Sequence, residues 1–235
     1  MLGRQGFGGL LSDEQWSQFL KSGSTRKYSD GEMIIHQGDR DRTVFLLVEG
    51  TVKVSMVHPD GAEVLLAVRG PGESLGELAA LSGLSRTATV TALGGPCLTR
   101  VLTSEQFRLL ARSMGLEGVL WQHVVSRQSE SDSLRAEMMA LPSGQRLAAT
   151  LLRLVDLVGG DIDSATFPSG ENGRRGAMLR LGLSQEELGK SVGLSRTAMA
   201  TGFTKLRSLN VVRTGRQYIS ILDVDRLRQL AAGTE

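Results

Sequence analysis

The sequence predicts an α+β protein in which a strand-rich N-terminal part is joined by one long helix to a mainly helical C-terminal part. Two observations carry this prediction. From about residue 25 to 102, short runs of Val, Ile, Thr and Leu alternate with Gly and Asp turns, which is typical of a compact antiparallel roll. After residue 104, apolar residues recur at spacings of three and four, which indicates helices.

Composition excludes several classes of protein. The 235 residues are 40% hydrophobic and 22% charged, which suits one large or two small globular domains. The longest apolar runs span five residues, at 44–48 and 64–68, whereas a membrane helix needs about 20. The first residues carry no secretory signal, so we expect a cytoplasmic protein. The single cysteine, Cys97, excludes an internal disulfide and an iron–sulfur cluster, and we expect it to be buried.

The charge is distributed unevenly along the chain. Residues 1–141 hold 14 Lys and Arg against 16 Asp and Glu, whereas residues 142–235 hold 13 against 9. The whole excess of positive charge therefore lies in the C-terminal part, which hints at a polyanionic partner there.

The N-terminal part contains three predicted helical segments and a long helix. We expect a helix over 10–20 capped by Ser12, a short helical insert over 76–84, and a helix that Ser104 opens. A long helix over 116–141 ends at Pro142. The predicted domains are therefore 1–115, the long helix 116–141, and 142–235. One stripe along the long helix is apolar at its ends and polar in its middle, and we expect the polar middle to meet a polar group. The stripe consists of Leu116, Val119, Leu120, His123, Val124, Arg127, Ser131, Leu134, Arg135 and Met138.

The C-terminal part is predicted as a helix-turn-helix with a following hairpin. A helix over 145–158, a Gly- and Ser-rich loop over 159–176 and a strand over 177–182 precede it. Ser184 begins a capping box with Glu187, Gly193 supplies the turn, and Ser195 caps the second helix. The hairpin spans 211–222 and turns at Thr214-Gly215.

The second helix of this motif has two faces. Met199, Phe203 and Leu206 form the face that we expect to be buried. The other face is polar, as a helix needs whose N-terminal turn enters the major groove of double-stranded DNA; the alternative is a helical hairpin whose arginines are simply solvated. This polar face carries Arg196, Thr197, Thr201 and Lys205.

One motif in the roll suits a phosphate ligand. Gly76-Glu77-Leu78-Ala79 begins the helical insert, and Arg86 and Thr87 follow nine and ten residues after Glu77. A helix N-terminus, an Arg fork and a hydroxyl can together bind one phosphate. Glu77 would be repelled by the phosphate, so in such a site it would accept hydrogen bonds from a sugar hydroxyl instead. The spacing alone is equally compatible with a surface Glu and Arg on a loop.

This pattern resembles the phosphate-binding cassette of cyclic-nucleotide-binding domains. The flanking segments Gly31-Glu32, Gln37-Gly38-Asp39 and Pro59-Asp60-Gly61 agree with it. With the C-terminal motif, residues 10–230 resemble transcription regulators of the cyclic AMP receptor protein/FNR (CRP/FNR) family. The resemblance implies a cyclic-nucleotide-binding β-roll, a dimerisation helix and a winged helix-turn-helix.

The resemblance also implies roles for particular residues. Cyclic AMP would bind with its ribose 2′-hydroxyl on Glu77 and its phosphate on Arg86, Thr87 and the backbone that begins at Gly76. A serine between 129 and 133 would contact the base; Ser131 is the first choice. The DNA-binding residues would be Ser184, Gln185, Ser195, Arg196, Thr197, Thr201, Lys205 and Arg216.

Partners and alternatives follow from the same resemblance. It implies a homodimer that binds DNA and contacts RNA polymerase, without a metal and away from membranes. The recognition helix begins Ser-Arg-Thr-Ala-Met rather than the family's Ser-Arg-Glu-Thr-Val, so we expect a different operator.

Four alternatives remain open. The roll could bind cyclic GMP, with a Thr87 contact to the base, or haem, with His36, His58 or His123 as candidate ligands. The pocket could be vestigial, or the chain could be a module that binds another protein. No nucleophile–base pair, HExxH motif or Walker loop is present in the sequence, so we do not expect an enzyme.

Overall fold

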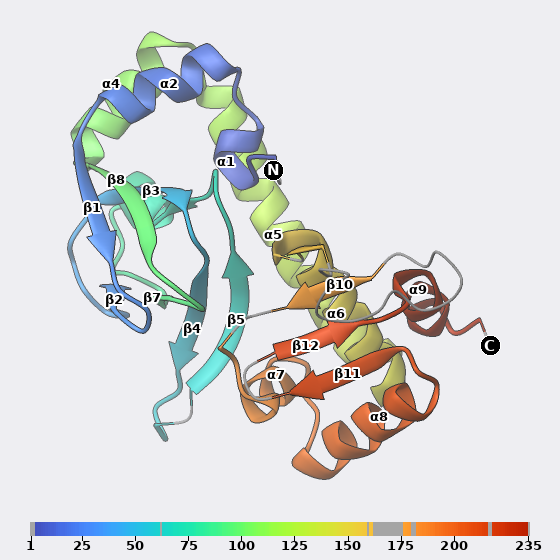
Figure 1. Ribbon diagram of the computed structural model, residues 1–235. Coiled ribbons are helices and arrows are strands. Elements are labelled where there is room, and N and C mark those ends of the chain that lie inside the picture. The colour runs from blue at the N-terminus through green and yellow to red at the C-terminus, as the bar shows by residue number, and fades with distance from the viewer. Residues whose placement is uncertain are drawn as a thin grey trace. The chain divides into compact units, whose positions relative to one another are not determined.

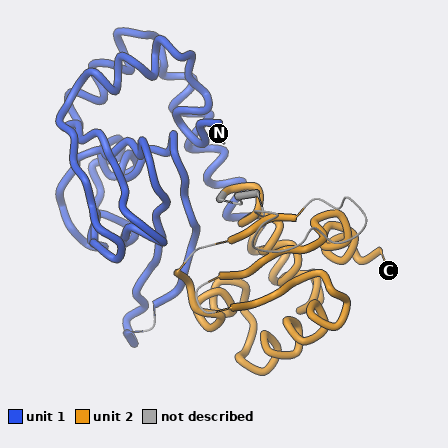
Figure 2. The backbone as a smooth tube through the Cα atoms, viewed as in Figure 1, with its two compact units in different colours: residues 1–133 blue, residues 134–235 orange. Residues whose placement is uncertain are grey.

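The computed structural model describes residues 3–61, 63–158, 160–161, 176–179, 182–215 and 218–234. The chain forms two compact units, Met1–Ser133 and Leu134–Glu235 (Figure 2). The boundary between them falls within the long helix α5 (Glu117–Ala140).

Two four-stranded antiparallel sheets form the roll of the N-terminal unit (Figure 1). Their orders are β1-β8-β3-β6 and β2-β7-β4-β5. The strands are β1 (Ser24–Tyr28), β2 (Met33–Ile35), β3 (Val44–Glu49), β4 (Val52–Val57), β5 (Glu63–Arg69), β6 (Ser74–Leu75), β7 (Thr89–Ala92) and β8 (Cys97–Leu102). The predicted α+β class, with an N-terminal roll, is confirmed.

Strand β3 is buried on both faces, which explains its unbroken apolar run. Side chains alternate across a strand, so Val44 and Leu46 enter one core while Phe45 and Leu47 enter another. The first core includes the helical layer, and the second fills the roll and contains the buried Cys97. Because β3 belongs to both cores, it fixes the helices and the roll to one another.

Short helices cover one end of the roll. They are α1 (Gly6–Gly9), α2 (Asp13–Lys21), α3 (Glu77–Ser82) and α4 (Ser104–Ser113). Ser12 and Thr103 form capping boxes at the starts of α2 and α4, which satisfies backbone N–H groups there. The rings of Phe7, Phe19 and Phe107 lie 5.4–5.5 Å apart and are fully buried. The predicted helices over 10–20 and from 104, and the helical insert, are confirmed.

The C-terminal unit is a helix-turn-helix domain with a small antiparallel sheet of order β11-β12-β10-β9 (Figure 1). Its helices are α6 (Ser143–Val158), α7 (Gln185–Ser191), α8 (Arg196–Ser208) and α9 (Val224–Ala232). Its strands are β9 (Gly160–Asp161), β10 (Ala177–Leu179), β11 (Val212–Gly215) and β12 (Tyr218–Ile221). Leu147, Leu151, Phe203 and Leu227 are fully buried in this unit.

Four details of the predicted C-terminal unit were wrong. Helix α6 begins at Ser143, directly after Pro142, because proline is tolerated at a helix start. The segment predicted as a loop contains β9, which pairs with β10, while residues 162–175 lie outside the described part. The hairpin does not turn at Thr214-Gly215: both belong to β11, and Gly215 pairs with Tyr218. The strand expected over 177–182 is β10, which ends at Leu179, and residues 182–184 follow outside any strand.

Candidate functional site: a cassette in the roll and a recognition helix

Gly76 forms the turn that leads from β6 into α3. Its φ of 80° is a left-handed conformation that favours glycine. A Cβ atom at this position would lie 2.1 Å from Nη1 of Arg86. Both the backbone conformation and the approach of the guanidinium therefore require Gly here.

Arg86 is buried, with only 4% of its surface exposed, and its guanidinium is bound by protein oxygens. Nη1 donates to the carbonyl of Gly76 at 2.7 Å. Nη2 donates to the carbonyl of Thr43 at 2.6 Å and to Asp41 Oδ2 at 3.0 Å. A fixed guanidinium next to a glycine turn is suited to an anionic ligand, since its planar fork matches phosphate geometry.

The loop around Arg86 is held by the segment that carries the Gln-Gly-Asp motif. The Gly38 N–H donates to the carbonyl of Arg86, and the Arg86 N–H donates to the carbonyl of Asp39, both at 2.8 Å. The Gln37 N–H donates to the Thr89 hydroxyl at 3.1 Å. These bonds explain why the flanking motif accompanies the cassette.

Asp41 is the acidic partner of Arg86, and its carboxylate is largely exposed. Burial opposes ionisation of this carboxyl, but hydrogen bonds from Thr43 and Arg86 lower its pKa below the ordinary value. Asp41 is therefore ionised at neutral pH and competes with any anionic ligand for Arg86. The sequence analysis did not select it, because it lies 45 residues before Arg86.

Glu77, the first residue of α3, is 4% exposed. Its Oε1 lies 3.3 Å from Nε2 of His123, on α5, and the same nitrogen lies 3.2 Å from the hydroxyl of Ser74. Ala79 is buried, whereas Leu78 and Thr87 are exposed. The structure therefore places Glu77 and Arg86 with Gly76 in one buried cassette, and Thr87 at its surface.

Ser131 lies on α5 and is half-buried. Among the described residues, no hydrogen bond joins it to the cassette. The neighbouring polar residues of α5 bind the roll instead: Arg127 Nη2 donates to Glu73 at 2.7 Å, and Glu130 accepts two bonds from Arg69 at 2.7 and 2.8 Å. Burial raises the pKa of Glu73, and the charges of Arg127 and Arg69 act against this shift. The polar middle of the predicted stripe thus meets charged groups of the roll.

The helix-turn-helix is built from the predicted signals. Ser184 forms a capping box at α7, and Ser195 accepts from the Ala198 N–H to cap α8. Gly193, with a φ of 63°, makes the turn. Gly189 allows close packing, since a Cβ there would lie 2.7 Å from Met199. As predicted, Met199, Phe203 and Leu206 are buried.

The candidate DNA-contacting residues that the structure describes are all exposed. They are Ser184, Gln185, Ser195, Arg196, Thr197, Thr201 and Lys205. Arg216 lies outside the described residues. The side chain of Arg196 is 84% exposed, and its Nη2 lies 2.7 Å from Glu186, which also pairs with Lys190. Hydrogen bonds from Lys190 and Arg196 lower the pKa of Glu186.

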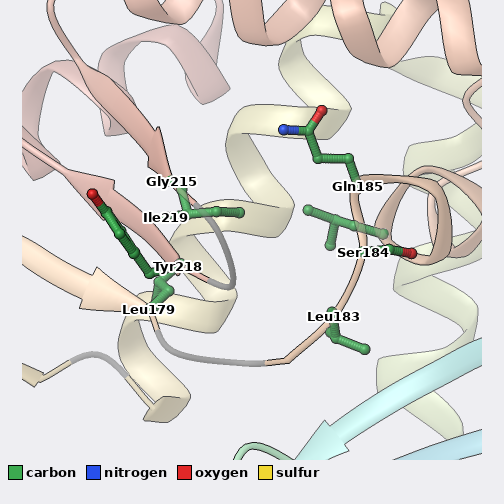
Figure 3. Close-up of a pocket in the computed structure, with 8 residues that line it drawn as sticks. Leu179, Leu183, Ser184, Gln185, Gly215, Tyr218 and Ile219 are labelled. Carbon is green, nitrogen blue, oxygen red and sulfur yellow. The ribbon is translucent and has the colours of Figure 1, made fainter.

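A hollow of about 150 Å³ lies between the hairpin and the start of α7 (Figure 3). Leu179, Tyr218 and Ile219 line it from the sheet, and Leu183, Ser184 and Gln185 line it from the segment entering α7 (Figure 3). Ligand pockets commonly have volumes of about 300–1,000 Å³. We therefore assign no effector to this hollow.

The three histidines differ in environment. His36, which follows β2 rather than lying within it, and His58 are exposed and pair with Asp39 and Asp60. His123 is buried. In the described part of the chain, no group of three or more His, Cys, Asp or Glu side chains is placed to hold a metal ion. No described helix is long and apolar enough to cross a membrane.

The fold and the two sites define a class of protein: a regulator with a nucleotide sensor domain and a helix-turn-helix domain. Comparison with known families agrees. The cyclic nucleotide-binding domain family matches residues 25–113, and the Crp-like helix-turn-helix domain family matches residues 145–230.

Individual relatives match over most or part of the chain. The cyclic AMP receptor protein of Thermus thermophilus is 26% identical over 95% of both chains. A cAMP-dependent protein kinase regulatory subunit of Mycosarcoma maydis is 36% identical over 48% of this chain and 22% of its own length. The crystal structure of a CRP/FNR-family transcriptional regulator from Thermus thermophilus has a TM-score of 0.69 and 23% identity, covering 90% of this chain and 100% of that one.

The chain belongs to the CRP/FNR family of transcription regulators, as the sequence predicted. It combines a cyclic nucleotide-binding domain with a DNA-binding helix-turn-helix. A curated relative from Salmonella typhimurium, 25% identical over 86% of this chain, is a global transcriptional regulator.

Proposed function

We propose that the chain is a homodimeric transcription regulator whose binding to double-stranded DNA is gated by cyclic AMP. Residues 1–115 would form the sensor, 116–141 the dimerisation helix and 142–235 the DNA-binding domain, with RNA polymerase as a partner at the promoter. The observation that carries the proposal is the buried Arg86 guanidinium held at the Gly76 turn, because a planar guanidinium fixed next to a glycine turn matches the geometry of a phosphate.

The nucleotide would bind with its cyclic phosphate at Arg86 and Thr87, and its ribose 2′-hydroxyl at Glu77. In this arrangement the phosphate replaces Asp41 as the anionic partner of Arg86. The choice of cyclic AMP is supported by two relatives whose names refer to it, a cyclic AMP receptor protein and a cAMP-dependent protein kinase regulatory subunit. We propose that Ser131 contacts the base.

Asp41→Asn should tighten the binding of cyclic AMP by up to about fivefold, since ion pairs with an exposed partner contribute about 0.2–1 kcal/mol. The substitution removes the competing charge and keeps an acceptor for Arg86. Titration calorimetry from pH 5.5 to 8 measures the effect, which should be constant because the lowered pKa of Asp41 keeps it ionised. Asp39→Asn is the control. An equal gain in affinity for cyclic AMP in this variant would show that the overall charge of the protein, rather than Asp41, causes the effect.

The exposed face of α5 supports a dimer. Trp121 is 70% exposed and Val125, one turn later, is 58% exposed. Large apolar side chains that neighbour each other on a helix favour a partner surface. A second copy of α5 would cover them in a two-fold dimer.

Trp121→Glu should convert the dimer to a monomer, because two carboxylates would be desolvated in the interface. Sedimentation or light scattering measures the mass. Ser126→Glu adds the same charge at an exposed position on another side of the helix and should leave the dimer intact. A dimeric Trp121→Glu variant would place the interface elsewhere.

The DNA proposal uses the N-terminal turn of α8. Arg196 would contact a base edge, with Thr197, Thr201 and Lys205 on the same helix, while Ser184, Gln185, Ser195 and Arg216 would contact the backbone. A two-fold dimer places two such helices on half-sites about one helical turn apart. The operator should therefore be palindromic.

The test joins ligand binding to DNA binding. Purified protein is titrated with cyclic AMP and, in parallel, with cyclic GMP, and DNA is selected from random sequence with and without the bound nucleotide. We expect micromolar binding of cyclic AMP, about −8 kcal/mol, and a palindromic sequence enriched only with the ligand. Preference for cyclic GMP, a Soret band in the purified protein, enrichment without ligand or retention of no DNA would each contradict the proposal.

A further inference from the structure

A buried contact joins the cassette to the long helix. Glu77 begins α3, and His123 lies in the second turn of α5, 46 residues later. The two residues are 4% and 2% exposed, and Glu77 Oε1 lies 3.3 Å from Nε2 of His123. Two polar groups from distant segments are thus partners in the interior of the N-terminal unit.

The chemistry of the pair fixes the direction of its hydrogen bond. A carboxylate can only accept, so Nε2 carries the hydrogen that lies between His123 and Glu77. The hydroxyl of Ser74, 3.2 Å from the same nitrogen, gives the imidazole a second polar neighbour. The edge of the ring packs against Phe7, with centroids 5.9 Å apart, so the orientation of the imidazole is set by the aromatic core.

We propose that His123 is a positioning residue for the effector: its imidazole holds the Glu77 carboxylate in the orientation that accepts the ribose 2′-hydroxyl. This inference rests on the proposed function of the cassette. A carboxylate has two oxygens with about four lone-pair sites, so it can accept from His123 at Oε1 and from a ribose hydroxyl at the same time. Because His123 holds Glu77 in one rotamer before the ligand binds, the Glu77 side chain loses less conformational entropy on binding.

The contact also links the effector to α5. Because His123 belongs to α5, any shift of this helix changes the position of the group that holds Glu77. Coupling between two sites is reciprocal, so a ribose that fixes Glu77 also favours one position of His123. The same hydrogen bond is therefore the point at which ribose recognition acts on the long helix.

The test compares cyclic AMP with 2′-deoxy cyclic AMP, using the full-length chain and titration calorimetry. The two ligands differ only in the hydroxyl assigned to Glu77. We expect the wild type to prefer cyclic AMP by roughly 10- to 100-fold, which is typical of one hydrogen bond to a charged group. In His123→Phe, which keeps a ring against Phe7 but has no donor, the preference should fall to about threefold or less, with little change for the deoxy ligand.

Two further variants separate positioning from packing. His123→Gln supplies an amide donor near the place of Nε2 and should restore most of the preference. His58→Phe removes an exposed histidine that pairs with Asp60 at 3.2 Å, and it should leave the preference unchanged. If His123→Phe does not fold, His123→Leu is the smaller donor-free variant.

The outcomes also separate this inference from the proposed function. An unchanged preference in a folded donor-free variant would overturn the role of His123 and leave the proposed function intact. Binding of neither nucleotide to the wild type would overturn the proposed function, and this inference with it.

Discussion

Arg86→Ala should weaken the binding of cyclic AMP by roughly 30-fold to several thousandfold, since truncating one partner of a buried charge pair commonly loses about 2–5 kcal/mol. Arg86 is the buried cation of the cassette, and it approaches Gly76 so closely that no side chain fits there. Without it, the phosphate would enter a partly desolvated site with no charge to balance it. Titration calorimetry measures the affinity, and operator binding with and without the nucleotide measures its consequence.

The same substitution removes three hydrogen bonds within the protein, so the folded state needs its own measurement. Thermal unfolding separates the two effects, because a ligand that binds only the native state stabilises it by about 2.7 kcal/mol at 100 times its Kd. We expect cyclic AMP to give no such stabilisation in Arg86→Ala, whatever the stability of this variant without the ligand.

Arg86→Lys and Arg42→Ala complete the comparison. Lysine keeps the charge but lacks the planar fork, so an intermediate loss of affinity is expected. Arg42 is an exposed neighbour that donates to the carbonyl of Gly83 at 3.3 Å, and its truncation should have little effect. Wild-type affinity in a folded Arg86→Ala variant would show that the phosphate does not bind at this site.

Local signals in the sequence were sufficient for most of the fold. Ser12, Ser184 and Ser195 cap the helices that their spacing predicted, because capping involves residues only three positions apart. The buried face of α8 follows from a helical period, and the insert in the roll follows from its unusual composition. These features depend on neighbours along the chain.

Contacts between distant segments could not be predicted in the same way. His123 belongs to the predicted stripe of the long helix, but no local pattern pairs it with Glu77. The same holds for Asp41 with Arg86 and for Glu73 with Arg127, which are brought together by the tertiary fold. β9 was missed for a related reason: a two-residue strand has no periodicity, and only its pairing with β10 defines it.

Arg196→Ala should reduce the affinity for the selected operator by roughly 30-fold to 10⁴-fold, because each lost base contact contributes about 1–3 kcal/mol and a two-fold dimer loses two. The largely exposed position of Arg196 at the first turn of α8 suits a contact to a guanine edge. The loss should be much smaller for unrelated DNA, where phosphate contacts dominate. Fluorescence anisotropy at a fixed salt concentration, with operator and scrambled DNA, measures both affinities.

Arg228→Ala is the matched control, since Arg228 is also exposed and pairs with a carboxylate, Asp225, at 2.8 Å.

Substitution of Glu186 should have the opposite effect on DNA binding. It binds Arg196 at 2.7 Å in the free protein, and its lowered pKa keeps it charged at neutral pH. Glu186→Gln should therefore tighten DNA binding, because Arg196 is released and one negative charge is removed from the surface that meets the phosphates. If Glu186→Gln instead weakened operator binding while leaving scrambled DNA unchanged, Glu186 would act by orienting Arg196 toward its base, and the ion pair would persist in the complex.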